Sequence, residues 1–297
     1  PLAKFISKRR SPVAKNIYKE IGNKSPILEL TQDQAKSLEK NLLKKGDYKC
    51  FVVMRCWHPR AENVIKEVKQ YNPEEIILLP LYPQYSASTS GSSIKEWHDL
   101  CKKENYKVKT KTICCYPTEN NFLESHANLI KKTIKNLENK NFKLLFSAHG
   151  LPEIKIKKGD PYQWQVEKTV EGIMSKLTDE NPDYIISYQS RVGPLKWIGP
   201  STDDIIIKYS KEKRGIVIVP VAFVSEHSET LVELDIEYKK LAEKNGCSFY
   251  KRVPALGIEE DFIKGLTELI LQKETKGNYV SSVMSPNKYS KCPCLSL

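Results

Sequence analysis

Short apolar runs alternate with amphipathic segments along most of the chain. The apolar runs are rich in Val, Ile and Leu, as buried strands are, and cover 50–55, 75–82, 109–113, 144–147, 184–188, 216–220 and 248–252. Between them, apolar residues recur at helical spacing, which predicts helices over 60–71, 92–104, 119–139, 163–177, 203–212, 229–245 and 259–273. Serines at the start of 92–104 are expected to cap that helix. The alternation is typical of parallel sheets covered by helices on both faces.

A polar stretch at 138–141 divides this pattern into two similar rounds. We therefore expect an α/β fold with an N-terminal domain at 1–138, a C-terminal domain at 139–277 and a cleft between them. A polar tail over 278–297 follows and is expected to be loosely ordered. Ligands of open parallel sheets bind outside the carboxyl ends of the strands, so residues that directly follow the strands are the candidates for function.

Composition narrows the class of protein. Of the 297 residues 40% are hydrophobic and 28% charged, and no apolar run is long enough to span a membrane. The net charge of +12 favours anionic partners, although a generally basic surface gives the same number. No nucleic-acid-binding motif is present. Eight cysteines are too few for a disulfide scaffold, which suggests buried thiols in a reducing, cytoplasmic compartment. The chain starts at Pro1, so the natural N-terminus is expected to be absent.

His149 is the first candidate for chemistry. It directly follows the apolar run 144–147 within FSAHGLP, and Gly150 and Pro152 end the strand sharply. An imidazole at the rim of a sheet can bind a metal or accept a proton. A capping or packing role is the alternative.

Three glutamates form the second candidate. Glu229, Glu233 and Glu237 are four residues apart and therefore lie on one face of a helix. Like charges in a row repel, and no nearby lysine is placed to neutralise Glu233. A metal ion or bound protons would compensate the row; a solvated helix surface is the alternative.

Two loops complete the set. Loop 189–200 holds Trp197 between Gly and Pro residues, which suits stacking on a flat aromatic ligand, or packing back on its own domain. Loop 81–93 contains Tyr85 and many hydroxyls before a helix, which suits an anion site, or ordinary caps.

With these segments together, the chain resembles the ferrochelatase family from about Phe5 to Gly257. Four motifs carry the resemblance in the family's order: FSAHGLP at 146–152, KGDPY at 158–162, YQSRVGPLKWIGPSTD at 188–203 and VAFVSEHSETLVELDIEY at 221–238. The resemblance implies two Rossmann-like, chelatase-type domains with the porphyrin in the interdomain cleft. It implies insertion of ferrous iron into protoporphyrin IX, the last step of haem synthesis, with both molecules as substrates.

The resemblance also assigns residue roles. His149 and Glu229 fall on the family's metal-site histidine and glutamate, with His149 the expected acceptor of the pyrrole protons. Glu233 and Glu237, with His227 beside them, fall on an acidic row that conducts iron or protons. The residues that the resemblance places around the porphyrin and its propionates are Trp197, Tyr85, Lys19 and Ser25. Lys19 stands where an arginine is common, so bidentate pairing with a carboxylate is lost there.

Two departures from the family pattern affect the expectations. The family's first strand and its glycine-containing loop lie upstream of Phe5, so the chain as given is expected to be incomplete there. Some members hold a [2Fe–2S] cluster on four cysteines. The tail offers only Cys292 and Cys294, and Ser125 stands at the internal cysteine position, so we expect no cluster and no tightly bound cofactor.

Other functions remain open at this point. A chelatase for another divalent metal and tetrapyrrole would share the His149–Glu229 pair. A non-catalytic tetrapyrrole- or metal-binding protein would share the fold. The surplus of lysine also suits peripheral contact with an anionic membrane on its inner face, or a nucleic-acid binder, although no motif supports the latter.

Overall fold

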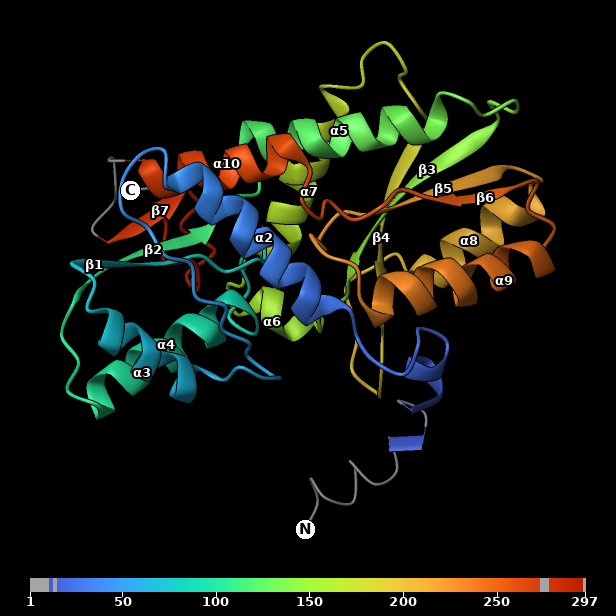
Figure 1. Cartoon of the computed structure of the whole chain (residues 1–297). Coiled ribbons are helices and arrows are strands. Elements are labelled where there is room, and N and C mark those ends of the chain that lie inside the picture. Colours follow the sequence, from blue (N-terminus) through green and yellow to red (C-terminus); the bar gives the residue numbers. More distant parts are fainter. Residues whose placement is uncertain (1–10, 13–14, 273–277, 296–297) are drawn as a thin grey trace.

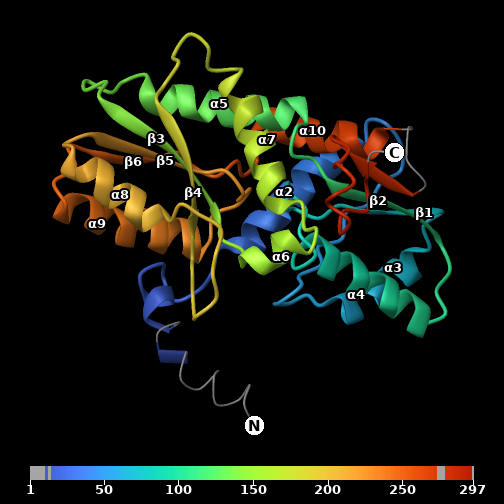
Figure 2. The ribbon, with the colours of Figure 1, turned by 180° about the vertical axis from the view of Figure 1, so that it is seen from behind.

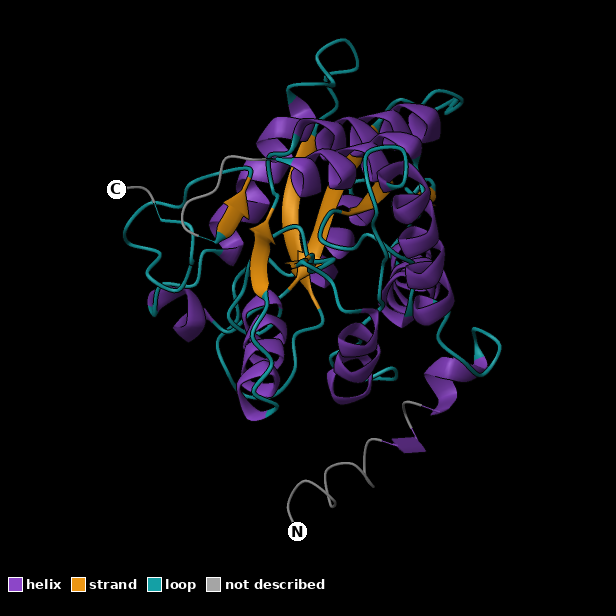
Figure 3. Cartoon of the chain, turned by 60° about the vertical axis from the view of Figure 1, so that its left-hand side comes forward, coloured by secondary structure: helices purple, strands orange, loops and turns teal. Residues whose placement is uncertain are grey.

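The computed structural model describes residues 11–12, 15–272 and 278–295, and it is built around two parallel sheets (Figure 1). The first has the strand order β1-β2-β7 and the second β4-β3-β5-β6. Every paired strand in both sheets is parallel. Helices lie on both sides of the strands (Figure 3), so the α/β fold with helix-covered parallel sheets is confirmed.

The first sheet consists of β1 (Glu75–Leu78), β2 (Lys109–Cys115) and β7 (Tyr279–Ser281). Helices α3 (Ala61–Tyr71) and α4 (Ser90–Lys103) cover β1. Val64, Ile65 and Val68 of α3 pack with Trp97 of α4 in one buried cluster. The strand expected over 75–82 ends at Leu78, and Pro80 beyond it has no N–H to donate to a neighbouring strand.

The second sheet consists of β3 (Phe142–His149), β4 (Tyr184–Gln189), β5 (Gly215–Pro220) and β6 (Tyr250–Arg252). Leu144 and Phe146 of β3 point into a core shared with helices from both halves of the chain, and Leu145 points into a second core on the opposite face. The first core takes α2 (Ile27–Leu42), α5 (Asn120–Ile134), α7 (Tyr162–Met174) and α10 (Glu260–Leu271); the second takes α8 (Thr202–Lys211) and α9 (Tyr238–Lys244). Both faces of this sheet are therefore buried (Figure 2).

Three sequence expectations are wrong in the described residues. The run 50–55 is not a strand, because its backbone pairs with no neighbouring strand even though Cys50 and Phe51 pack on the cores. The serines do not cap α4: no side chain caps it, and the Ser92 hydroxyl donates to backbone carbonyls instead. The tail is not loosely ordered over 278–295, because it contributes β7 and two buried cysteines.

The helix expected over 229–245 has two parts. A π-helix, η1 (Glu229–Glu237), comes first, and α9 continues it. The Tyr238 N–H bonds to the Glu233 carbonyl, five residues back, which is the π pattern. Such turns are rare and are frequently found at functional sites. The domain limits 1–138, 139–277 and 278–297 stay a prediction.

Candidate active site

His149 is the last residue of β3, and a tight turn follows it. The Gly150 N–H donates to the Gln189 carbonyl of neighbouring β4 at 2.9 Å. A Cβ at Gly150 would lie 2.9 Å from that carbonyl oxygen and 3.3 Å from the Trp197 ring. Only glycine therefore lets the chain turn this close to the strand end, with the imidazole half-exposed at the sheet edge.

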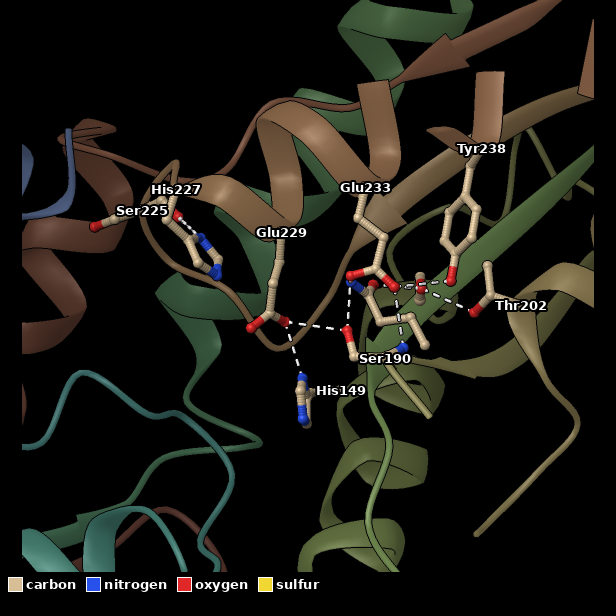
Figure 4. A network of polar contacts seen from close by, with 10 residues as sticks. His149, Ser190, Thr202, Ser225, His227, Glu229, Glu233 and Tyr238 are labelled. Carbon is tan, nitrogen blue, oxygen red and sulfur yellow. Dashed lines mark hydrogen bonds and ion pairs between the residues drawn. The ribbon is translucent and has the colours of Figure 1, made fainter. Parts of the chain in front are cut away.

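Glu229, the first residue of η1, meets His149 from the other side. The His149 Nδ1 lies 2.8 Å from the Glu229 Oε2 (Figure 4). The side chains are 40% and 31% exposed, so the pair is partly shielded and still reachable. Because Nδ1 is engaged, Nε2 is the ring nitrogen left for a substrate, and within the described residues it has no hydrogen-bond partner.

The two groups shift each other's pKa in opposite directions. Burial alone would lower the pKa of His149, but the hydrogen bond to Glu229 and the charges of Glu229 and Glu233 raise it above its ordinary value. Burial alone would raise the pKa of Glu229, but His149, the charge of His227 and a Ser190 hydrogen bond lower it. His149 is therefore a stronger proton acceptor than an ordinary imidazole. Glu229 beside it stays ionised to a lower pH than an ordinary glutamate.

Glu233, one turn along η1, lies in a different environment. Its carboxylate accepts hydrogen bonds from the Ser190 N–H at 3.0 Å, the Ser190 hydroxyl at 2.7 Å and the Gln189 amide at 3.1 Å (Figure 4). The Tyr238 hydroxyl donates at 3.0 Å. Burial and the charge of Glu229 nevertheless raise the pKa of Glu233, despite these donors. Hydrogen-bond donors at the end of β4 and in α9 thus partly compensate the charge of Glu233, for which the sequence offered no neighbouring lysine. Glu233 still takes up a proton more readily than an ordinary glutamate.

His227 and Glu237 flank this pair of glutamates. The His227 ring bonds to the Ser225 carbonyl at 3.1 Å and projects beside Glu229 (Figure 4). Glu237, at the end of η1, is exposed, and among the described residues no hydrogen bond or ion pair holds its side chain. The structure therefore brings His149, Glu229, Glu233 and His227 together and leaves Glu237 at the surface.

Trp197 lies next to the end of β3. Residues Pro152 and Trp197 form an antiparallel bridge, and the indole N–H donates to the Val192 carbonyl at 3.1 Å. The ring packs against Gly150. The flat, half-buried ring of Trp197 thus lies against the residue that follows His149.

The other expected porphyrin residues are not brought to His149. Tyr85 is only 7% exposed and packs among buried cysteines. Lys19 and Ser25 precede α2, where the Ser25 hydroxyl accepts the Ile27 N–H, and within the described residues no hydrogen bond or ion pair joins them to the His149–Glu229 pair. Their roles stay predictions. Burial, the charge of Cys56 and the charge of Glu229 raise the pKa of Tyr82, which belongs to the same loop as Tyr85.

Sequence reasoning missed three residues that organise the site. Ser190 links both glutamates, because its hydroxyl also lies 3.5 Å from the Glu229 Oε2. It holds a left-handed backbone conformation at φ 59°. Gln189 connects Glu233 to Ser147 inside the sheet, and Tyr238 connects it to Asp203 at 3.4 Å. The available signal was position: Gln189 ends, and Ser190 directly follows, the strand beside the one that carries His149.

No helix in the described part of the chain is both long and apolar enough to cross a bilayer.

Comparison with known proteins shows which family the chain matches. The family model described as "Ferrochelatase" matches residues 1–274. A ferrochelatase of Pelagibacter ubique is 64% identical over all of this chain and 88% of the relative. A ferrochelatase of Rickettsia felis is 47% identical over 99% of this chain and 86% of the relative.

Solved structures agree on the fold. SirB from Bacillus subtilis, determined with Fe³⁺, aligns with a TM-score of 0.58 at 15% identity, over 81% of this chain and 88% of SirB. DR2241 from Deinococcus radiodurans, described as similar to chelatases, aligns with a TM-score of 0.52 at 12% identity, over 84% of this chain and 52% of DR2241. At these identities the likeness concerns architecture alone.

Proposed function

The chain belongs to the ferrochelatase family, and from that premise we propose that its His149–Glu229 pair is the centre at which iron enters the porphyrin. The reaction is the insertion of ferrous iron into protoporphyrin to form haem, so the protein is a lyase of haem synthesis. The observation that carries the assignment is the 2.8 Å contact between Nδ1 of His149 and Oε2 of Glu229 at the carboxyl edge of the second sheet.

The first task of such a centre is to take protons. Insertion releases two pyrrole protons, and a base must stand close to the ring nitrogens. Nε2 of His149 is the free position, while the carboxylate at Nδ1 stabilises the imidazolium that forms. The raised pKa of His149 makes it a better base than a lone imidazole.

The second task is to handle iron without trapping it. One imidazole and one carboxylate are ligands of intermediate softness that suit ferrous iron. Neither is fully buried, so the ion can exchange. His227 beside Glu229 offers a further nitrogen.

Protons then need a way out, and hydrogen bonds outline one. Ser190 connects Glu229 to Glu233, the Tyr238 hydroxyl donates to Glu233, and Asp203 lies beyond Tyr238 at an exposed position. The raised pKa of Glu233 suits a group that accepts and returns a proton. We assign Glu233 to proton transfer, and Glu237, exposed at the end of the same helix, to the outer end of the acidic row.

Trp197 supplies the flat surface for the macrocycle. Its ring packs on Gly150 beside the proposed base, so a porphyrin stacked there would bring its nitrogens toward His149. A planar macrocycle resists a metal entering its plane, and a rigid wall that bends it would expose the nitrogen lone pairs. Insertion by this route requires no resident cofactor and no iron–sulfur cluster.

A titration tests the whole assignment. Protoporphyrin added to the purified chain should give a saturable absorbance change, and ferrous iron should then convert the spectrum to that of haem, catalytically. Saturable binding without turnover would indicate a non-catalytic tetrapyrrole-binding protein. Faster turnover with another divalent metal and another tetrapyrrole would indicate a different chelatase.

We also propose that the protein works in the cytoplasm in peripheral contact with the inner face of an anionic membrane. The net charge of +12 supports this, as do the exposed loop residues Trp57, Val192 and Leu195. The chain should sediment with anionic vesicles at low salt and stay behind with zwitterionic ones. Equal sedimentation with both, or none with either, would contradict the proposal.

A further inference from the structure

Arg252 joins the edge strand of the second sheet to the segment that carries the site glutamates. It is the last residue of β6, and β6 lies at the end of the strand order β4-β3-β5-β6. The side chain of Arg252 is only 11% exposed. A guanidinium this far removed from water needs anionic partners, because an unpaired buried charge is costly. Arg252 has two such partners, one within η1 and one just before it.

The first partner is Asp235, which lies in η1 between Glu233 and Glu237. The Arg252 Nε donates to the Asp235 Oδ1 at 2.7 Å, and Nη2 donates to Oδ2 at 2.8 Å. Two parallel bonds of this kind fix the orientation of the two groups as well as their distance. A lysine ammonium is a point charge and cannot reproduce this geometry.

The second partner is Glu226, in the loop that leads into η1, three residues before Glu229. The Arg252 Nη1 donates to the Glu226 Oε1 at 2.8 Å, and the Ala255 N–H donates to the same oxygen at 2.9 Å. Burial alone would raise the pKa of Glu226, but the charge of Arg252 and these hydrogen bonds lower it. One guanidinium therefore binds the chain on both sides of the stretch that holds Glu229 and Glu233.

The helix η1 has few stabilising features of its own. Within the described chain no side-chain hydrogen bond caps its N-terminus, and no basic residue lies in its last turn. Strand β6 supplies contacts instead. Tyr250, which shares a strand face with Arg252, donates its hydroxyl to the Leu234 carbonyl at 2.6 Å. The position of η1 on the sheet thus depends on β6, and Arg252 makes both of the carboxylate contacts.

We propose that Arg252 is a positioning residue of the site, which fixes η1 so that Glu229 stays against His149. This role rests on the proposed function of that pair. Arg252 itself contacts the carboxylates of Glu226 and Asp235 and neither member of the pair, so it acts through the backbone of η1. A displacement of about 1 Å at a reacting group can cost roughly 10²-fold in rate.

Amide hydrogen exchange on the full chain tests this contact without using activity. In Arg252→Gln the amides of 229–237 should exchange at least about tenfold faster than in the native chain, while those of β3 and α7 keep their native rates. Arg214→Gln is the matched control. Its guanidinium bonds to Asp183 at 2.7 Å and to the Phe142 carbonyl at 2.6 Å, at the amino end of the same sheet, and its loss should leave η1 unchanged.

A second variant covers the case in which Arg252→Gln fails to fold. Asp235 is 37% exposed, so Asp235→Ala removes the bidentate partner at little cost to the core. Arg252 keeps its bond to Glu226 in this variant. Exchange in η1 should again be faster than in the native chain, by a smaller factor than in Arg252→Gln.

Single-turnover insertion tests the consequence for the reaction. Arg252→Gln should lower the rate by roughly 10–100-fold, while the Kd for protoporphyrin stays within about twofold because Trp197 lies outside η1. Arg252→Lys should recover only part of the rate. Arg252→Gln added to Glu229→Gln should cost less than it does in the native chain, because the carboxylate that Arg252 positions is already gone.

Native exchange rates of η1 in both Arg252→Gln and Asp235→Ala would overturn the proposal. So would faster exchange spread evenly over the second sheet, which indicates a general loss of stability, or losses of rate that simply multiply in the double variant. If the native chain binds protoporphyrin but inserts no iron, the proposed function fails, and the exchange rates still decide whether Arg252 fixes η1.

Discussion

The two sheets end differently at their carboxyl edges. The second sheet ends in His149 and, after β5, in Glu229, which are nitrogen and oxygen donors that solvent still reaches. The first ends, at β2, in Cys114 and Cys115, which are buried sulfur donors joined by two more thiols from the chain terminus. The same sheet edge thus carries partly exposed nitrogen and oxygen donors in one half and buried sulfur atoms in the other.

A similar contrast exists within η1. Glu229 and Glu233 are one turn apart, yet the pKa of Glu229 is lowered and that of Glu233 is raised. Burial raises the pKa of both glutamates. Their neighbours make the difference, because His149 and His227 lower the pKa of Glu229, while Glu233 has only neutral donors and the negative charge of Glu229 nearby. A carboxylate with a lowered pKa holds charge beside the base, and one with a raised pKa passes a proton on.

His149→Ala should give the largest loss. Removing the base is expected to lower the rate of iron insertion by roughly 10²–10⁴-fold, while the Kd for protoporphyrin changes little, because Trp197 and the surrounding loop remain. Absorbance titration and single-turnover insertion measure the two effects separately. His98→Ala, on the exposed surface of α4, is the control. Retained turnover in His149→Ala would refute the assigned role.

Glu229→Gln should cost less, by roughly 10–100-fold, because the imidazole stays but loses the charge that orients and stabilises its protonated form. Steady-state insertion assays measure this, with Glu243→Gln as a control on exposed α9. A loss as small as that of the control would show that the 2.8 Å contact has no part in the reaction.

Glu233→Gln should slow insertion less than Glu229→Gln, by about tenfold or less. The amide keeps the shape of Glu233 and the hydrogen bonds accepted at one oxygen, but it cannot relay a proton. Tyr238→Phe interrupts the same route one step further out and should give a loss of similar size in the same assay. Equal or reversed losses for the two glutamates would show that the acidic row is ordered wrongly here.

The sequence pattern predicted most of the fold because apolar residues recur with a characteristic spacing in strands and in helices. Strand β3 and helix α3 lie within a residue or two of their expected bounds. The prediction of a strand at 50–55 was wrong because apolar side chains can pack in a core even where no strand is available to pair with their backbone. The π-helix was not visible because glutamates four residues apart share a face in either kind of helix.

For the site, motif spacing identified His149 and Glu229 as candidates, but it could not show that they touch. Ser190 and Gln189 escaped notice because their importance comes from where β4 lies beside β3, which is a property of the sheet. The contact between the Cys114 and Cys294 sulfur atoms was missed for a related reason, because the two residues are 180 positions apart in the sequence.

The pH dependence of kcat/KM for protoporphyrin, in the native chain and in Glu229→Gln, tests the central claim most directly. His149 must be neutral to accept a proton, so activity should fall as the pH drops through its pKa, which Glu229 raises above the ordinary value of about 6.5. Without that charge the pKa of His149 falls, and the acid limb of the profile should move to lower pH in Glu229→Gln. An acid limb that stays in place or moves to higher pH would contradict the account.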